Sequence, residues 1–166
     1  MVLFTVVLWV HIFSAIGWLG AAMVFGIILA PSLAKLSPQT RGEFMVKVVP
    51  KYLRYFELFS GMTIVFGVAT AAVLLNGDFS KVSLSTPFGL YITVGAVLAL
   101  LVFVVSYSVT IPITRKIIRI SESMMKTPGP PPPELKVLAN RQKVITTASL
   151  LVMILITVLM VAGSTL

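Results

Sequence analysis

The chain has 166 residues, of which 58% are hydrophobic and 11% are charged, and its mean hydropathy is +1.05. This composition excludes an ordinary water-soluble domain and favours a polytopic membrane protein in which residues 1–166 form a single domain. The absence of cysteine excludes disulfides, thiolate metal sites and iron–sulfur clusters.

The first predicted membrane span covers residues 3–31 and carries the single histidine of the chain, His11. At about 1.5 Å per residue, a helix of this length crosses the roughly 30 Å hydrocarbon core of a bilayer. Its apolar run is too long for a cleavable signal peptide, so we expect it to stay in the mature protein. Gly17 and Ala21 have the spacing that lets a second helix approach closely in lipid.

The second predicted span covers residues 52–75. Before it, Thr40 and Glu43 match the S/T-x-x-E capping box, which predicts that a short helix begins there. Asn76-Gly77-Asp78 follows the span with turn-forming residues. One face of the span is small and weakly polar and suits packing against the first span; it comprises Ser60, Thr63, Gly67, Thr70 and Ala71.

The third predicted span covers residues 87–112, because Thr86 supplies an N-cap and Pro87 a favoured first helical residue. An amphipathic extension follows it over residues 113–124, with apolar residues on one stripe and basic residues off it. A Pro-rich linker over residues 128–133 ends this extension as a stiff spacer. The fourth predicted span covers residues 144–162.

The distribution of basic residues predicts the topology. Twelve of the 13 Lys and Arg residues fall in the segments between spans one and two and between spans three and four, and the remaining one is Lys81. By the positive-inside rule, both termini lie outside and the two long basic loops, with the Pro-rich linker, are cytoplasmic. We therefore expect an all-α, four-transmembrane-helix antiparallel bundle in the plasma membrane of a prokaryote. The net charge of +8 follows from this topology and gives no reason to expect nucleic-acid binding.

An ionisable side chain at membrane depth is costly without a partner, which makes His11 the leading functional candidate. With the N-terminus outside, it lies about 12 Å below the outer end of its helix. A purely structural role would be a neutral imidazole bonded to a hydroxyl such as that of Thr70 or Tyr91. As a metal ligand, His11 would hold haem iron or Cu(I), with Met153 or Met160 as a second ligand. His11 alone would leave an open haem position.

A second candidate site lies at the inner edge of the bundle. Glu57 paired with Arg54 or Arg115 would be a structural anchor at the membrane interface. The functional alternative is that Arg54 and Arg115 bind an anion or haem propionates. Trp18, seven residues after His11 and on the same helical face, is a candidate cofactor contact, although packing is its simpler role.

Three stretches resemble the copper-resistance D-like superfamily of small helical membrane proteins, which includes HemJ-like proteins. This resemblance implies a four-helix membrane unit whose first-helix histidine, here His11, binds haem b or takes part in copper handling. The matching stretches are the H-x6-W-x-G run from His11 to Gly20, Ala30-Pro31 with residues 50–56, and the pair Gly61 and Gly67.

We therefore expect an integral membrane protein that binds haem b, with His11 as axial ligand, in electron transfer or haem metabolism. One alternative is a copper-handling transport protein with His11, Met153 and Met160 as metal ligands. Another is a non-catalytic accessory subunit of a membrane complex. Small-residue faces leave spare packing surface on four helices, so we also expect a homo-oligomer or a membrane partner subunit. The sequence predicts no particular enzyme.

Overall fold

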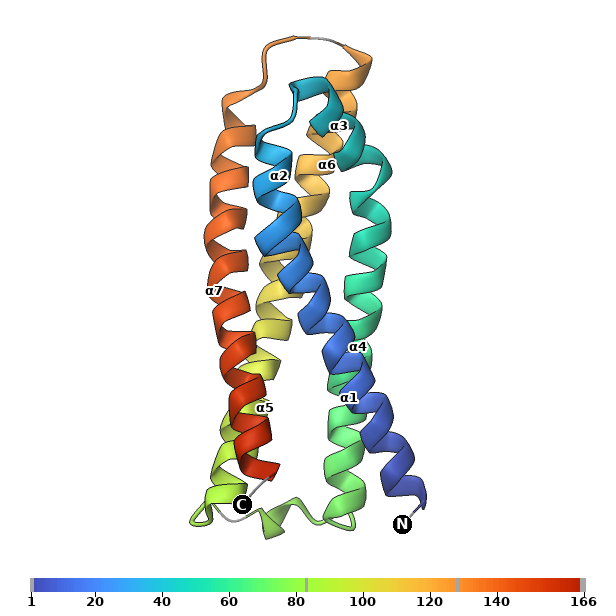
Figure 1. The fold of residues 1–166 in the computed structure, drawn as a ribbon, viewed down its shortest axis with the longest axis vertical. Helices are drawn as coiled ribbons and strands as arrows, with labels where there is room; N and C mark the ends of the chain where they lie inside the picture. Colours follow the sequence, from blue (N-terminus) through green and yellow to red (C-terminus); the bar gives the residue numbers. More distant parts are fainter. Residues whose placement is uncertain (1, 83, 128, 165–166) are drawn as a thin grey trace.

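The computed structural model describes residues 2–82, 84–127 and 129–164, and every regular element in these ranges is helical (Figure 1). Four of the helices are long and apolar enough to cross a membrane: Val2–Ala34, Val49–Leu74, Pro87–Lys126 and Pro133–Gly163. The prediction of an all-α protein with four long apolar helices that could cross a membrane is thus confirmed.

Two of the four long helices contain a π-helical turn that the sequence analysis did not predict. The first consists of α1 (Val2–Met23), the π-turn η1 (Val24–Leu29) and α2 (Ala30–Ala34). The third consists of α5 (Pro87–Val105), the π-turn η3 (Ser106–Thr110) and α6 (Ile111–Lys126). Each π-turn ends two residues before a proline, Pro31 or Pro112. Proline has no backbone N–H and crowds the preceding turn, and the wider π-turn accommodates it.

The segment between the first two long helices forms α3 (Pro38–Lys47). The prediction that this helix begins at Thr40 was wrong: Ser37 is the N-cap, and its hydroxyl accepts a hydrogen bond from the Thr40 backbone N–H at 3.2 Å. Pro38 then occupies the first turn, where a missing N–H costs nothing. The helix therefore begins one turn earlier than the capping box suggested.

We expect Ser37→Ala to destabilise the protein by about 1 kcal/mol, the usual effect of losing an N-cap hydroxyl. Ser32→Ala is the matched control, because Ser32 is an exposed serine of the neighbouring helix α2. Thermal unfolding in detergent measures both variants. Equal unfolding temperatures for the two variants would contradict the assignment of Ser37 as the cap.

The second and fourth long helices begin earlier than the predicted spans. Helix α4 (Val49–Leu74) has Pro50 in its first turn, and it ends at a left-handed turn in which Asn76 has φ 52° and Gly77 has φ 76°. A short 3-10 turn, η2 (Phe79–Lys81), follows. As predicted, the Thr86 side chain caps α5 by accepting from the Gly89 N–H at 3.2 Å. Helix α7 (Pro133–Ser164) starts directly at the end of the Pro-rich linker.

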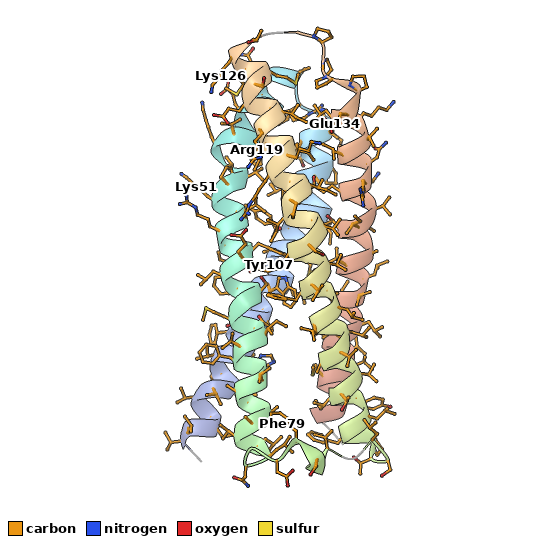
Figure 2. All side chains as sticks on the ribbon, turned by 180° about the vertical axis from the view of Figure 1, so that it is seen from behind. Lys51, Phe79, Tyr107, Arg119, Lys126 and Glu134 are labelled. Atoms are coloured by element: carbon orange, nitrogen blue, oxygen red, sulfur yellow. The ribbon has the colours of Figure 1, made fainter. Side chains whose placement is uncertain are left out.

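The long helices form two antiparallel hairpins, one of α1 with α4 and one of α5 with α7 (Figure 1). The N- and C-terminal ends lie at the same end of the bundle. The other end, which we call the basic end, carries α3, Lys126 and Glu134, whereas Phe79 lies at the end with the termini (Figure 2). Helix α3 packs against α6 at the basic end. The buried core joins the two hairpins through residues that include Trp18, Phe25, Phe56, Val102 and Met153.

Candidate functional site

His11 of α1 faces α4, and its Nδ1 atom lies 2.9 Å from the backbone carbonyl oxygen of Thr63. A carbonyl oxygen only accepts hydrogen bonds, so Nδ1 must carry the hydrogen. In the neutral imidazole, Nε2 then has a free lone pair. Histidines that bind metals commonly have this arrangement, in which the second ring nitrogen donates to a backbone carbonyl.

Gly67 explains why the Thr63 carbonyl can accept this bond. The carbonyl of residue 63 points along the helix axis toward residue 67, one turn later. Gly67 has no side chain, and a Cβ atom placed there would lie 2.9 Å from Cε1 and 3.2 Å from Nδ1 of His11. The glycine therefore makes room for the imidazole, and the carbonyl uses its second lone pair to hold the ring.

The second hairpin also has a glycine that the neighbouring helix approaches closely, Gly163, where an added Cβ would lie 3.2 Å from the Cβ atom of Tyr91. Ile92 packs against the same glycine, whose added Cβ would lie 3.4 Å from Cδ1 of Ile92. This helix–glycine contact of the second hairpin is thus made by Tyr91 and the apolar side chain of Ile92.

The hydroxyl groups that the sequence suggested as structural partners of His11 are not its partners. The Thr70 hydroxyl donates to the Phe66 carbonyl at 2.7 Å, within α4. The Thr63 hydroxyl likewise donates to the Phe59 carbonyl at 2.7 Å. His11 is therefore held by a backbone carbonyl and not by a side chain.

The two methionines predicted as second ligands lie at other helix contacts. Met160 of α7 packs against Gly95 of α5, where an added Cβ would lie 2.9 Å from the methionine Cε atom. Met153 is 5% exposed and belongs to the buried core. The structure thus places Met160 inside the second hairpin and His11 inside the first, and within the described residues His11 forms no hydrogen bond to either methionine sulfur.

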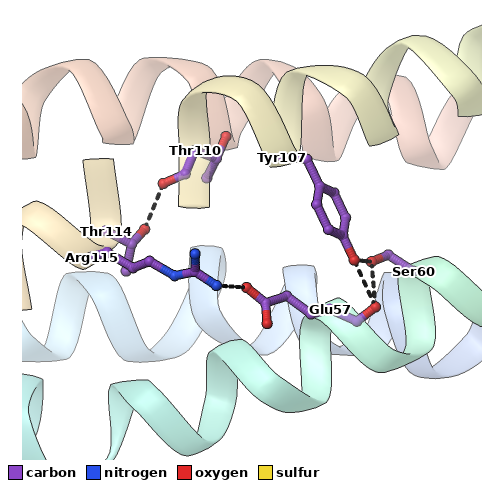
Figure 3. Close-up of polar contacts among 6 residues, drawn as sticks. All are labelled: Glu57, Ser60, Tyr107, Thr110, Thr114 and Arg115. Atoms are coloured by element: carbon purple, nitrogen blue, oxygen red, sulfur yellow. Dashed lines mark hydrogen bonds and ion pairs between the residues drawn. The ribbon is translucent and has the colours of Figure 1, made fainter. Parts of the chain in front are cut away.

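The predicted arginines lie toward the basic end, away from His11. Arg115 of α6 forms an ion pair with Glu57 of α4, and the Tyr107 hydroxyl donates to the Glu57 backbone carbonyl at 2.9 Å (Figure 3). Of the two partners considered for Glu57, the structure therefore shows Arg115. Arg54 is exposed on α4. It precedes Gly67 by 13 residues, which corresponds to about 20 Å along the helix.

Trp18 is 3% exposed and packs edge-on against Phe56 and Phe103. Its indole N–H is buried and has no hydrogen-bond partner among the described residues. An unpaired buried donor is uncommon in folded proteins, because it loses its hydration without compensation. Trp18 therefore packs in the core, and its unpaired indole N–H lies on the same face of α1 as His11.

The sequence did not predict a polar chamber in the basic half of the bundle. The chamber has a volume of about 40 Å³ and lies between η1, α4, the η3–α6 segment and α7. The sequence does contain a signal for the chamber, because hydroxyl and amide residues recur at helical spacing on two of the long helices. These residues are Ser106, Thr110 and Thr114 on one helix and Gln142, Thr146 and Ser149 on another.

Within the described ranges, no group of three or more His, Asp or Glu side chains could hold a metal ion. No protein-family model, curated protein or solved structure matches the chain. The functional interpretation consequently rests on the geometry around His11.

Proposed function

We propose that this chain is an integral membrane protein that binds haem b through Nε2 of His11, and that it acts in electron transfer or haem metabolism. The observation that supports this most is the hydrogen bond from Nδ1 to the Thr63 carbonyl, which leaves Nε2 as the free ligand atom. The resemblance of the His11–Gly20 run to the copper-resistance D-like superfamily, which includes HemJ-like proteins, points to the same residue. Haem supplies a one-electron redox centre when it is bound.

The residues around His11 fit this cofactor. Haem needs one strong axial donor from the protein, and an imidazole oriented by a backbone carbonyl is such a donor. Gly67 makes the room that the imidazole itself occupies, so the ring can reach the Thr63 carbonyl. Trp18 lies about 10 Å further along the same face and has an unpaired N–H that is available to a carboxylate or another acceptor.

The proposal assigns His11 as the only axial ligand from the chain. Met153 and Met160 pack at other contacts, and the Arg115 guanidinium is already paired with Glu57. The contact of Met160 with Gly95 in the second hairpin supports copper less well, because Cu(I) would need the thioether sulfur beside the imidazole. The chain's own contribution is to hold one imidazole in a fixed tautomer in an apolar environment.

The test is a visible absorption spectrum of the detergent-purified protein, recorded oxidised and then dithionite-reduced. The haem proposal predicts a Soret band that shifts on reduction. A flat spectrum with bound copper would favour the copper-handling alternative instead. A flat spectrum with no metal, from a protein that co-purifies with a larger complex, would favour an accessory subunit. Self-association or a partner subunit stays a prediction, tested by crosslinking in mild detergent.

The basic end is proposed to be cytoplasmic, and the absence of cysteine makes this easy to test with single cysteines. Leu84, 60% exposed, lies near the end with the termini, and Lys136 is exposed at the basic end. In intact cells, a membrane-impermeant maleimide is expected to label Leu84→Cys at once and Lys136→Cys only after permeabilisation. The reverse pattern would overturn the proposed topology.

A further inference from the structure

The polar chamber is separate from the His11 site, because its α4 residues Tyr52 and Phe56 lie about two to four turns from Thr63 and Gly67. Aromatic and aliphatic side chains, including Phe25, Phe56, Leu150 and Met153, form part of its wall. Most of the exposed wall is apolar, and its polar atoms come from six hydroxyl or amide residues: Ser106, Thr110, Thr114, Gln142, Thr146 and Ser149. Such polar groups in the interior of a membrane bundle require hydrogen-bond partners.

Much of the polar wall is left with free acceptors. The Thr114 hydroxyl donates to the Thr110 carbonyl at 2.8 Å (Figure 3), so it can only accept from Gln142, whose amide nitrogen lies 2.7 Å away. Gln142 therefore keeps its amide oxygen for another donor. The Ser106 hydroxyl donates to the Val102 carbonyl at 2.8 Å and keeps its lone pairs.

Thr146 is the chamber residue that most requires a bound hydrogen-bonding molecule. Its hydroxyl oxygen is buried and has no hydrogen-bond partner among the described residues. A buried hydroxyl without a partner costs about 1–3 kcal/mol, which a bound hydrogen-bonding molecule would relieve. The wall therefore offers one unused hydroxyl and several acceptor oxygens.

We propose that the chamber is a binding site for a cluster of about three water molecules. One water occupies about 10–15 Å³ of such a volume, so the 40 Å³ of the chamber fits a cluster of this size. Water donates two hydrogen bonds, which suits the free acceptor oxygens of Gln142 and Ser106. No carboxylate is among the residues that line the chamber, so a cation there would lack a counter-charge.

X-ray hydroxyl-radical footprinting of the purified full chain tests this proposal, because radicals form from water held beside a side chain. Met153 lines the chamber, whereas Met45 of α3 is similarly buried and does not. Oxidation of Met153 is expected to be several-fold faster than that of Met45. Equal, slow oxidation of the two methionines would show a dry chamber and overturn the proposal.

Thr146→Val provides a second readout, with Thr147→Val, an exposed neighbour, as its matched control. If water satisfies the hydroxyl, we expect the Thr146 variant to unfold a few degrees below the control and to oxidise Met153 more slowly. A higher unfolding temperature for Thr146→Val than for Thr147→Val would mean that no water binds the Thr146 hydroxyl, and would contradict the proposal. So would an unfolding temperature that depends on replacing sodium by choline, which would indicate a bound cation.

Discussion

Replacement of His11 by alanine is expected to abolish the Soret band of the purified protein. The variant loses the only imidazole of the chain and with it the proposed axial ligand Nε2. The fold should persist, because alanine is smaller than the imidazole that packs beside Gly67 and so introduces no steric conflict. Absorption spectra normalised to protein concentration, in the oxidised and dithionite-reduced states, measure the effect.

Two controls separate ligation from damage to the fold. Thr70→Ala removes a hydroxyl of α4 that donates within its own helix, and we expect it to retain the full Soret band. Added imidazole should restore part of the band in His11→Ala, since it can enter the vacated space. Unchanged absorption in His11→Ala would mean that haem, if bound, is ligated elsewhere.

Gly67→Ala is expected to have the second largest effect, because the new Cβ atom would lie 2.9 Å from Cε1 of His11. The imidazole would have to move, which breaks its bond to the Thr63 carbonyl and displaces Nε2. Overpacking of this kind costs about 1–3 kcal/mol of stability. We expect haem content to fall at least several-fold and the unfolding temperature to drop.

Gly20→Ala is the matched control, because no atom lies within 4 Å of a Cβ placed at that helical glycine. Haem content and unfolding temperature should remain close to those of the original protein. If Gly67→Ala behaved like Gly20→Ala in both measurements, the close approach of His11 to α4 would be wrong.

The fold was largely predictable from local signals. Long apolar runs predicted the four helices, and Thr86-Pro87 predicted the start of α5 because a hydroxyl cap followed by proline is a strong local signal. The small face of α4 was also predicted to pack against the first helix, and Gly67 does so through His11. These features depend on residues close together in sequence.

Other features were not predicted, because the local sequence allows two alternatives and does not indicate which one forms. Ser37 and Thr40 both offer a capping hydroxyl, and Pro38 favours the earlier start that the structure shows. The π-turns before Pro31 and Pro112 depend on how each long helix accommodates a proline, and proline can also kink a helix. The sequence shows where the prolines lie but does not indicate whether the helix forms a π-turn or a kink before them.

The candidate site was predictable in its main residue and not in its partner. His11 could be identified from the sequence because placing an ionisable side chain in an apolar membrane helix costs free energy. Its partner was sought among hydroxyl side chains such as Thr70, whereas the structure shows the backbone carbonyl of Thr63. A helix carbonyl is normally committed to its own helix, and only the contact with Gly67 makes this one available to a second helix.

Selective labelling with ¹⁵N-histidine tests ligation by His11 most directly, because the chain contains one histidine and every labelled nitrogen signal belongs to it. Electron–nuclear double resonance of the oxidised, haem-loaded protein would then report whether that histidine touches the iron. We predict one strongly coupled ¹⁵N, from Nε2, and one weakly coupled ¹⁵N, from the Nδ1 that donates to Thr63. A haem-loaded sample without any strongly coupled ¹⁵N would contradict His11 as the axial ligand.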